Sequence, residues 1–154
     1  MNRVTVVTLG VADLEASEQF YGQIFDTAPV RDYDGVCFFP LPGCWVSLYP
    51  LAHLAEDISP ETPKSRSGFS GITLAHNVKT NDEVIAVIER ARAAGATVVK
   101  EPQDTFWGGF SGYFADPDGY HWEVVGAPMF EFSDDGALLY KKKELDGEQD
   151  MRSD

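Results

Sequence analysis

The residues best suited to chemistry lie at positions 120–125, directly after a turn at residues 116–119. Aromatic and β-branched residues in this stretch predict a strand. Because side chains alternate along a strand, His121, Glu123 and Val125 share one face. A carboxylate two residues from an imidazole could transfer protons, contribute to a metal site or anchor a cationic ligand. A glutamate on a surface strand that only faces solvent is the simpler alternative.

Aromatic side chains form a second set of candidate binding residues. In the strand predicted at residues 44–50, Trp45, Ser47 and Tyr49 share one face. Their rings could stack on a planar ligand, although burial in an ordinary core explains Trp45 equally well. Trp107 is followed by two glycines in a predicted loop, and this position favours a lid over a core residue.

The charge balance narrows the choice of partner. The 154 residues include 12 Lys and Arg against 25 Asp and Glu, which gives a net charge of −13. Phosphate groups are bound by cationic side chains, so we expect no nucleic acid and no membrane as partner, whereas a cationic small molecule would be attracted.

Three further features bear on location. No apolar run approaches the ~20 residues of a membrane helix, and the N-terminus continues directly into a strand pattern without a signal peptide. Cys37 and Cys44 are expected to be free thiols. Together these features predict a cytoplasmic protein.

The order of predicted elements repeats along the chain. Residues 3–11 predict a strand, residues 14–25 a helix that begins after Asp13, and residues 30–50 three short strands. Residues 71–78 then predict a strand, Thr80 and Glu83 a capping box that opens a second helix, and residues 97–125 three more strands. The sequence therefore predicts an α+β fold of two tandem βαβββ modules.

The expected boundaries are residues 1–58 for the first module, 59–70 for a connector, 71–128 for the second module and 129–154 for a C-terminal tail whose end is disordered. One helix per module covers one face of each sheet, so the other faces stay open and can form a curved half-barrel trough for a small molecule. Strand edges and apolar rims of such a trough need cover, which predicts a homodimer.

Two runs carry a resemblance to a known family. FADPDG at residues 114–119, followed by WEV at 122–124, resembles the closing turn and strand of the vicinal-oxygen-chelate superfamily. This superfamily includes glyoxalase I, extradiol dioxygenases, methylmalonyl-CoA epimerase and the fosfomycin- and bleomycin-resistance proteins. VADL at residues 11–14 and WGGFSGY at 107–113 are similar to further parts of it. The resemblance covers residues 2–128 and implies paired βαβββ modules.

The resemblance also implies where metal ligands would stand, because metal-binding members take one ligand from the first and one from the last strand of each module. Those positions here are Val6, Ser47, Gly71 and Glu123. A catalytic divalent ion needs about three protein ligands, and of these four residues Glu123 alone is a good one. We therefore expect no metal and no other cofactor. A divalent metal held by His53, His121 and Glu123 is the remaining alternative.

Two functions follow from the trough and the resemblance. A protein of the bleomycin-resistance type would bind a small aromatic or cationic molecule without a metal, through Trp45, Ser47, Tyr49, Trp107 and Glu123. A glyoxalase-related lyase or isomerase would instead use Glu123, with His121 beside it, as general base. Such an enzyme also needs an electrophile that stabilises the enolate, and the sequence alone identifies none.

Overall fold

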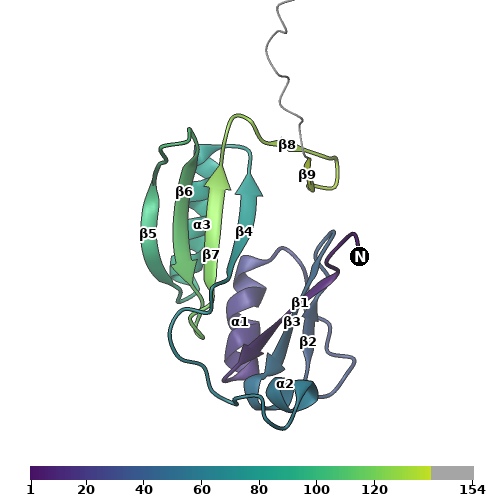
Figure 1. Ribbon diagram of the computed structural model, residues 1–154. Coiled ribbons are helices and arrows are strands. Elements are labelled where there is room, and N and C mark those ends of the chain that lie inside the picture. The colour runs from purple at the N-terminus through teal and green to yellow at the C-terminus, as the bar shows by residue number, and fades with distance from the viewer. Residues whose placement is uncertain (140–154) are drawn as a thin grey trace, which may run out of the picture.

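A computed structural model describes residues 1–139 and shows two consecutive modules, which confirms the predicted α+β fold (Figure 1). The second module has the full βαβββ order, and in the first module one of the four predicted strands is reduced to a bridge. Module 1 consists of β1 (Val6–Val11), α1 (Leu14–Ile24), β2 (Cys37–Phe39), β3 (Trp45–Pro50) and α2 (Leu51–Ile58). Module 2 consists of β4 (Thr73–Val78), α3 (Asn81–Ala93), β5 (Thr97–Asp104), β6 (Phe110–Ala115) and β7 (His121–Gly126). A hairpin of β8 (Glu131–Phe132) and β9 (Leu138–Leu139) follows. The predicted disorder at the end of the tail lies outside the described residues.

The two sheets have the same strand pattern. In module 1 the order is β1-β3-β2, and in module 2 it is β4-β7-β6-β5. The first strand of each module runs parallel to its last strand, while the remaining neighbours are antiparallel. The strand expected near residues 30–33 is reduced to one bridge between Val30 and Phe38.

Helices α1 and α3 begin at residues whose side chains cap them. Asp13 accepts a hydrogen bond from the Ala16 amide at the start of α1. Thr80 and Glu83 form the reciprocal capping box of α3. After α3, Gly95 has a φ of 100°, a left-handed conformation that glycine adopts without strain. Local sequence signals therefore account for α1 and α3.

The sequence near residues 51–56 predicts one helical turn, and helix α2 is longer than that. It spans eight residues and packs through Leu51 and Leu54 on Gly10, on the face of the module 1 sheet that α1 does not cover. Gly10 permits this contact, since a Cβ there would lie 2.7 Å from Leu51 Cδ1. The open face of module 1 is thus covered at one end.

The helix-covered faces of both sheets share one core. The Trp122 ring of module 2 lies 6.1 Å from the Tyr21 ring and 5.8 Å from the Phe25 ring, both of module 1. On its other side it stacks on Phe114 at 6.2 Å. Helix α1 lies at the junction of the two modules (Figure 1). Sequence periodicity predicted each amphipathic helix but not this common core.

The turn at residues 116–119 joins the modules by hydrogen bonds. Asp118 accepts from the Ala12 amide at 2.8 Å and from the Ser17 hydroxyl at 3.1 Å, both near the start of α1. Asp116 accepts from the Tyr21 hydroxyl at 2.5 Å, and Tyr21 accepts in turn from Trp122 Nε1 at 3.1 Å. Burial raises the pKa of Asp116, while the bond from Tyr21 opposes the rise. We call these contacts the joint.

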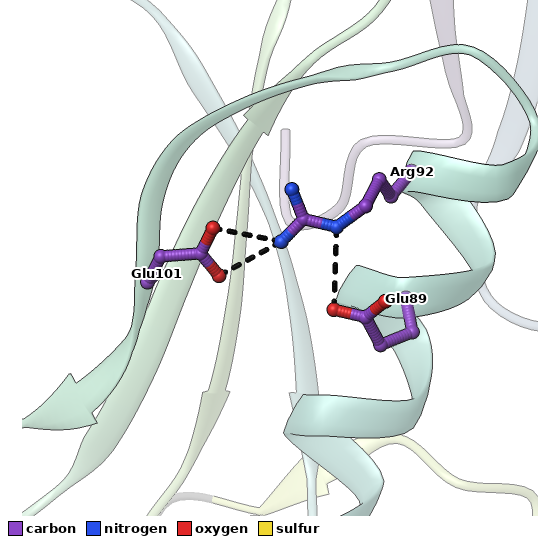
Figure 2. Close-up of polar contacts among 3 residues, drawn as sticks. All are labelled: Glu89, Arg92 and Glu101. Atoms are coloured by element: carbon purple, nitrogen blue, oxygen red, sulfur yellow. Dashed lines mark hydrogen bonds and ion pairs between the residues drawn. The ribbon is translucent and has the colours of Figure 1, made fainter.

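A surface ion-pair network connects α3 with β5 (Figure 2). Arg92 Nη2 donates to both carboxylate oxygens of Glu101 at 2.7 and 2.9 Å, and Arg92 Nε donates to Glu89 at 3.3 Å. All three side chains are largely exposed. Water and salt screen such pairs, so we assign the network a supporting role in the fold.

Residues 1–139 contain no helix with the length and apolar character needed to cross a membrane. Both cysteines are free, with Cys37 buried and Cys44 half-buried.

Candidate functional site

Helix α1 covers one face of the module 1 sheet, and helix α3 covers one face of the module 2 sheet. We call the other face of each sheet its open face. In module 2, strand register places four residues side by side on this face. Ala75 on β4 is opposite Glu123 on β7, Glu123 is opposite Tyr113 on β6, and Tyr113 is opposite Lys100 on β5. We call Ala75, Glu123, Tyr113 and Lys100 the polar row.

Glu123 and Tyr113 form the centre of the polar row. Both side chains are half-buried. Partial burial and the neighbouring Glu123 carboxylate raise the pKa of Tyr113, so its hydroxyl stays protonated at neutral pH. The Lys100 ammonium lies 5.8 Å from the centroid of the Tyr113 ring, a distance at which a cation is attracted to the ring face. The row therefore holds a carboxylate, a hydroxyl donor and an ammonium group.

His121 lies on the same open face as Glu123, as the strand pattern predicted. It is half-buried and pairs with Thr73 across the sheet. Its ring is 5.5 Å from the Phe69 ring in an edge-to-face arrangement. Phe69 belongs to the connector and is 70% exposed, so it forms an apolar margin beside the polar row.

The open face of module 1 is aromatic. Trp45 on β3 is 45% exposed, which rules out the core alternative for this residue. Its ring lies 6.1 Å from Phe38, whose ring lies 6.4 Å from Tyr33. We call Tyr33, Phe38 and Trp45 the aromatic wall. Ser47 shares this face but is buried beneath its neighbours, with 2% exposure.

Two predicted binding residues have other neighbours. The Tyr49 ring lies 5.9 Å from His53 of α2, and burial and Asp57 raise the pKa of Tyr49. The Trp107 ring folds over Gly109, where a Cβ would lie 2.2 Å from it, and sits 6.3 Å from the Phe130 ring. Within residues 1–139, no hydrogen bond or ring contact connects Glu123 with Trp45, Tyr49 or Trp107. The predicted residues thus fall into separate groups within one chain.

Sequence reasoning missed Tyr113 and Lys100. The signal for Tyr113 was present, because β6 and β7 form a hairpin in which Ala115 is opposite His121. Tyr113 lies two residues before Ala115, and Glu123 lies two residues after His121, so Tyr113 and Glu123 are also opposite each other. Lys100 could not be placed this way, since register shifts interrupt the pairing of β5 with β6.

The residues at the family's metal positions do not fit a metal. Gly71 precedes β4 and has a φ of 76°, so the prediction that placed it in the strand was wrong. In module 1, Val6 lies opposite Trp45, two residues before Ser47. In module 2 the residue two positions before Glu123 is His121, which lies opposite Thr73. Thr73 therefore occupies the position that corresponds to Val6. A valine and two hydroxyl side chains beside one carboxylate make a poor donor set.

The alternative site through His53, His121 and Glu123 also lacks support in a single chain. His53 contacts Tyr49 on the module 1 side. Among the residues that the structure describes, no group of three His, Cys, Asp or Glu side chains is arranged to hold a metal ion. We therefore derive no step through a metal.

Comparison with known proteins identifies the family. Residues 3–124 match the model of the Glyoxalase/Bleomycin resistance protein/Dioxygenase superfamily. The chain belongs to this superfamily, as the turn and strand at residues 114–124 indicated.

Solved structures agree with the match. A glyoxalase-related enzyme from Fulvimarina pelagi is 36% identical, with a TM-score of 0.83 over 92% of this chain and 100% of that one. A glyoxalase/bleomycin resistance protein/dioxygenase from Nocardioides is 27% identical, with a TM-score of 0.68 over 84% and 85% of the two chains. Lactoylglutathione lyase from Agrobacterium tumefaciens, at 23% identity and a TM-score of 0.64 over 86% and 99%, shares the fold.

Curated relatives match a shorter segment. An uncharacterised protein of Mycobacterium bovis is 40% identical over 68 residues, which is 44% of this chain and 44% of that protein. The matched segment spans less than half the length of these relatives.

Proposed function

We propose that this protein binds a small molecule without a metal, in a trough whose polar side is the open face of module 2. The observation that carries the proposal is Glu123, a half-buried carboxylate in the middle of an uncovered sheet face. A carboxylate in that position is suited to a cationic or hydrogen-bonding group of a ligand. The net charge of −13 favours the approach of a cation.

The aromatic wall supplies the second side of the proposed trough. Val6 and Trp45 are 42% and 45% exposed on the open face of module 1, and exposed apolar side chains in one area are typical of a surface that becomes covered. Glu123 and Trp45 lie on different sheets without a described contact. We propose that a homodimer brings the aromatic wall of one chain opposite the polar row of its partner.

The proposed ligand is therefore partly aromatic and carries a positive charge or a hydrogen-bond donor. Nucleic acids and anionic membranes are repelled by the acidic surface, so they are not proposed partners. We place the protein in the cytoplasm.

Thermal shift with a matched set of probes tests this function. Benzylamine, benzyl alcohol and benzoate share a ring and differ in charge. We expect benzylamine to raise the melting temperature, through preferential binding to the folded protein, with no change on addition of EDTA. Glu123→Gln should abolish the preference for benzylamine over benzyl alcohol. Loss of all stabilisation in EDTA would contradict the metal-independent site.

A second function, a glyoxalase-related lyase or isomerase, is favoured by one observation. Tyr113 stands beside Glu123, with Lys100 on its far side, and these two groups could stabilise negative charge on a carbonyl oxygen, which the sequence alone did not offer. The Fulvimarina pelagi protein is described as a glyoxalase-related enzyme. Here Glu123 would take a proton from the carbon next to a carbonyl, the electron pair would move to the oxygen, and the proton would return to a carbon.

Proton exchange separates the two functions. An enzyme of this kind should exchange the C–H protons of a small α-hydroxy carbonyl compound for deuterium in heavy water, and Glu123→Gln should stop the exchange. Unchanged exchange in this variant would exclude Glu123 as the base.

A further inference from the structure

We infer that Phe69 is a specificity-determining residue of the proposed site: a movable aromatic cover beside the polar row, which selects ligands that carry a ring next to their positive charge. The inference rests on the proposed function and adds the residue of the same chain that contacts the aromatic part of the ligand. It starts from a ring contact on the open face of module 2.

This contact places Phe69 on the same face as Glu123. The Phe69 and His121 ring centroids are 5.5 Å apart, and the rings meet edge to face at 83°. His121 points away from the core, because the next residue of β7, Trp122, is buried in it. Glu123 follows His121 on the open face, about 7 Å further along the strand. A ligand whose charged group binds Glu123 can therefore place an adjoining ring beside Phe69.

The aromatic residues that the sequence predicted for binding lie elsewhere in the chain. Trp45 and Tyr49 belong to β3 of module 1, and the Trp107 ring folds over its own loop. Phe69 is 70% exposed, so its ring does not serve the core. When a ligand ring packs against it, apolar surface is removed from water and binding is favoured.

Two glycines border the segment that carries Phe69. Gly68 has a φ of 69° and Gly71 a φ of 76°, which are left-handed conformations that other residues adopt only with strain. Apart from its chain neighbours, a Cβ at either position would meet no atom within 4 Å. The backbone conformation, and not a lack of room, therefore requires glycine. Because glycine has the widest choice of backbone angles, residues 68–71 can move Phe69 without moving the sheet.

The segment is fastened just outside both glycines. Before it, the Arg66 guanidinium lies 3.8 Å from the centre of the Tyr120 ring, and Arg66 Nη1 donates to the Asp118 carbonyl oxygen at 3.5 Å. After it, Thr73 opens β4 and pairs with β7. Among the residues that the structure describes, the segment itself makes one ring contact and no side-chain hydrogen bond. Few contacts oppose its displacement, so it can close over a ligand.

The first test detects the contact of Phe69 with His121 and needs no ligand. Histidine labelled with carbon-13 in the ring reports the three histidines separately by NMR. Phe69→Ala removes a ring whose magnetic field acts on its neighbour, so the His121 signal should move and that of His76 should not. Phe106→Ala, which removes a fully exposed ring, should move neither. An unmoved His121 signal in Phe69→Ala would overturn the position of the cover.

The second test compares benzylamine, which has a charge and a ring, with methylamine, which has the charge alone. Phe69→Ala should weaken benzylamine binding about three- to tenfold in isothermal titration and leave methylamine binding unchanged. Phe69→Tyr keeps the ring and should retain the affinity, and Phe106→Ala is the matched control. Equal weakening of both amines, or of neither, would overturn the selection by Phe69.

The third test concerns the movement of the segment. An L-residue at Gly71 disfavours the backbone conformation of the cover, so Gly71→Ala should weaken benzylamine binding but add nothing in a Phe69→Ala background. Gly136→Ala is the control, since Gly136 has a φ of 86° in the hairpin of β8 and β9. Full benzylamine affinity in Gly71→Ala, or additive weakening in the double variant, would overturn the role of this glycine.

Failure of the inference differs from failure of the proposed function. Benzylamine that binds through Glu123 with equal affinity in the wild-type protein and in Phe69→Ala would support the function and overturn the cover. Absence of any benzylamine binding that depends on Glu123 would overturn both.

Discussion

The two modules have one topology and two different open faces. In module 1 the face carries the aromatic wall and is covered at one end by α2. In module 2 the face carries the polar row. The opposite faces of both sheets are alike, because they contribute aromatic side chains to a single core. The repeat therefore preserves packing on one side of each sheet and divides the binding chemistry between the other two sides.

The largest expected effect comes from the core that the two modules share. Trp122→Ala removes a ring that packs against both modules, and a buried aromatic truncation costs about 3–5 kcal/mol. Urea denaturation should show the lower stability in one cooperative transition. Phe106→Ala is the matched control, since Phe106 is fully exposed and should change stability by less than about 0.5 kcal/mol. Two separate transitions would show that the modules unfold independently.

The joint gives the next effect. Tyr21→Phe leaves Asp116 without its hydroxyl donor and Trp122 Nε1 without its acceptor. Buried polar groups that lose a partner cost about 1–3 kcal/mol, and we expect a loss of that size in urea denaturation. An unchanged free energy of unfolding would mean that the hydroxyl is not needed between the modules.

The division of chemistry between the open faces can be tested by mixing two variants. Trp45→Ala should weaken all aromatic probes about three- to tenfold, whereas Glu123→Gln should weaken only cationic ones. If each trough combines two chains, a heterodimer of these variants contains one intact trough. Isothermal titration of the unfolded and refolded mixture should then recover part of the benzylamine binding. If the mixture binds benzylamine only as well as the average of the two homodimers, each trough lies within one chain.

The two thiols of module 1 differ in their surroundings, and this difference can be tested. Burial, with Glu18 beside it, raises the pKa of Cys37 to about 12. Iodoacetamide at pH 8 should therefore label Cys44, which is half-buried, and leave Cys37 unmodified. The folded pKa lies above the unfolded value of about 8.5, so the stability from the protonated thiol is lost as pH rises from about 9 towards 12. Cys37→Ala should reduce this alkaline loss, and equal labelling of both thiols would refute the assignment.

Much of the fold was predictable because its signals are local. Asp13, the capping box of Thr80 and Glu83, and the turn at residues 116–119 each act on their own neighbours in the sequence. The length of α2 depends on its contact with Gly10, and the correct strand position of Thr73 depends on pairing with β7. These contacts join residues that are far apart in the sequence, so short sequence segments cannot predict them.

The candidate site was predictable in part for the same reason. Alternation placed His121 with Glu123, and Trp45 with Ser47 and Tyr49. It could not show that these groups lie on separate sheets, because that arrangement results from the shared core. Ligand, assembly and metal independence stay predictions.

The smallest expected effect lies on the outer surface of module 2. Arg92→Ala removes the ion pairs to Glu89 and Glu101, which are exposed on α3 and β5. Exposed pairs contribute about 0–1 kcal/mol, and we expect a loss of less than about 0.5 kcal/mol that disappears in 1 M salt. A larger loss would indicate that the network holds β5 in place.

The joint has a consequence for how such proteins diverge. Asp116 and Asp118 hold α1 and Trp122 in place, and none of these contacts involves the polar row or the aromatic wall. Substitutions on the open faces can therefore accumulate without loosening the attachment of one module to the other. A motif search that finds this turn retrieves a shared architecture, while the reaction or ligand of each relative is written in other residues.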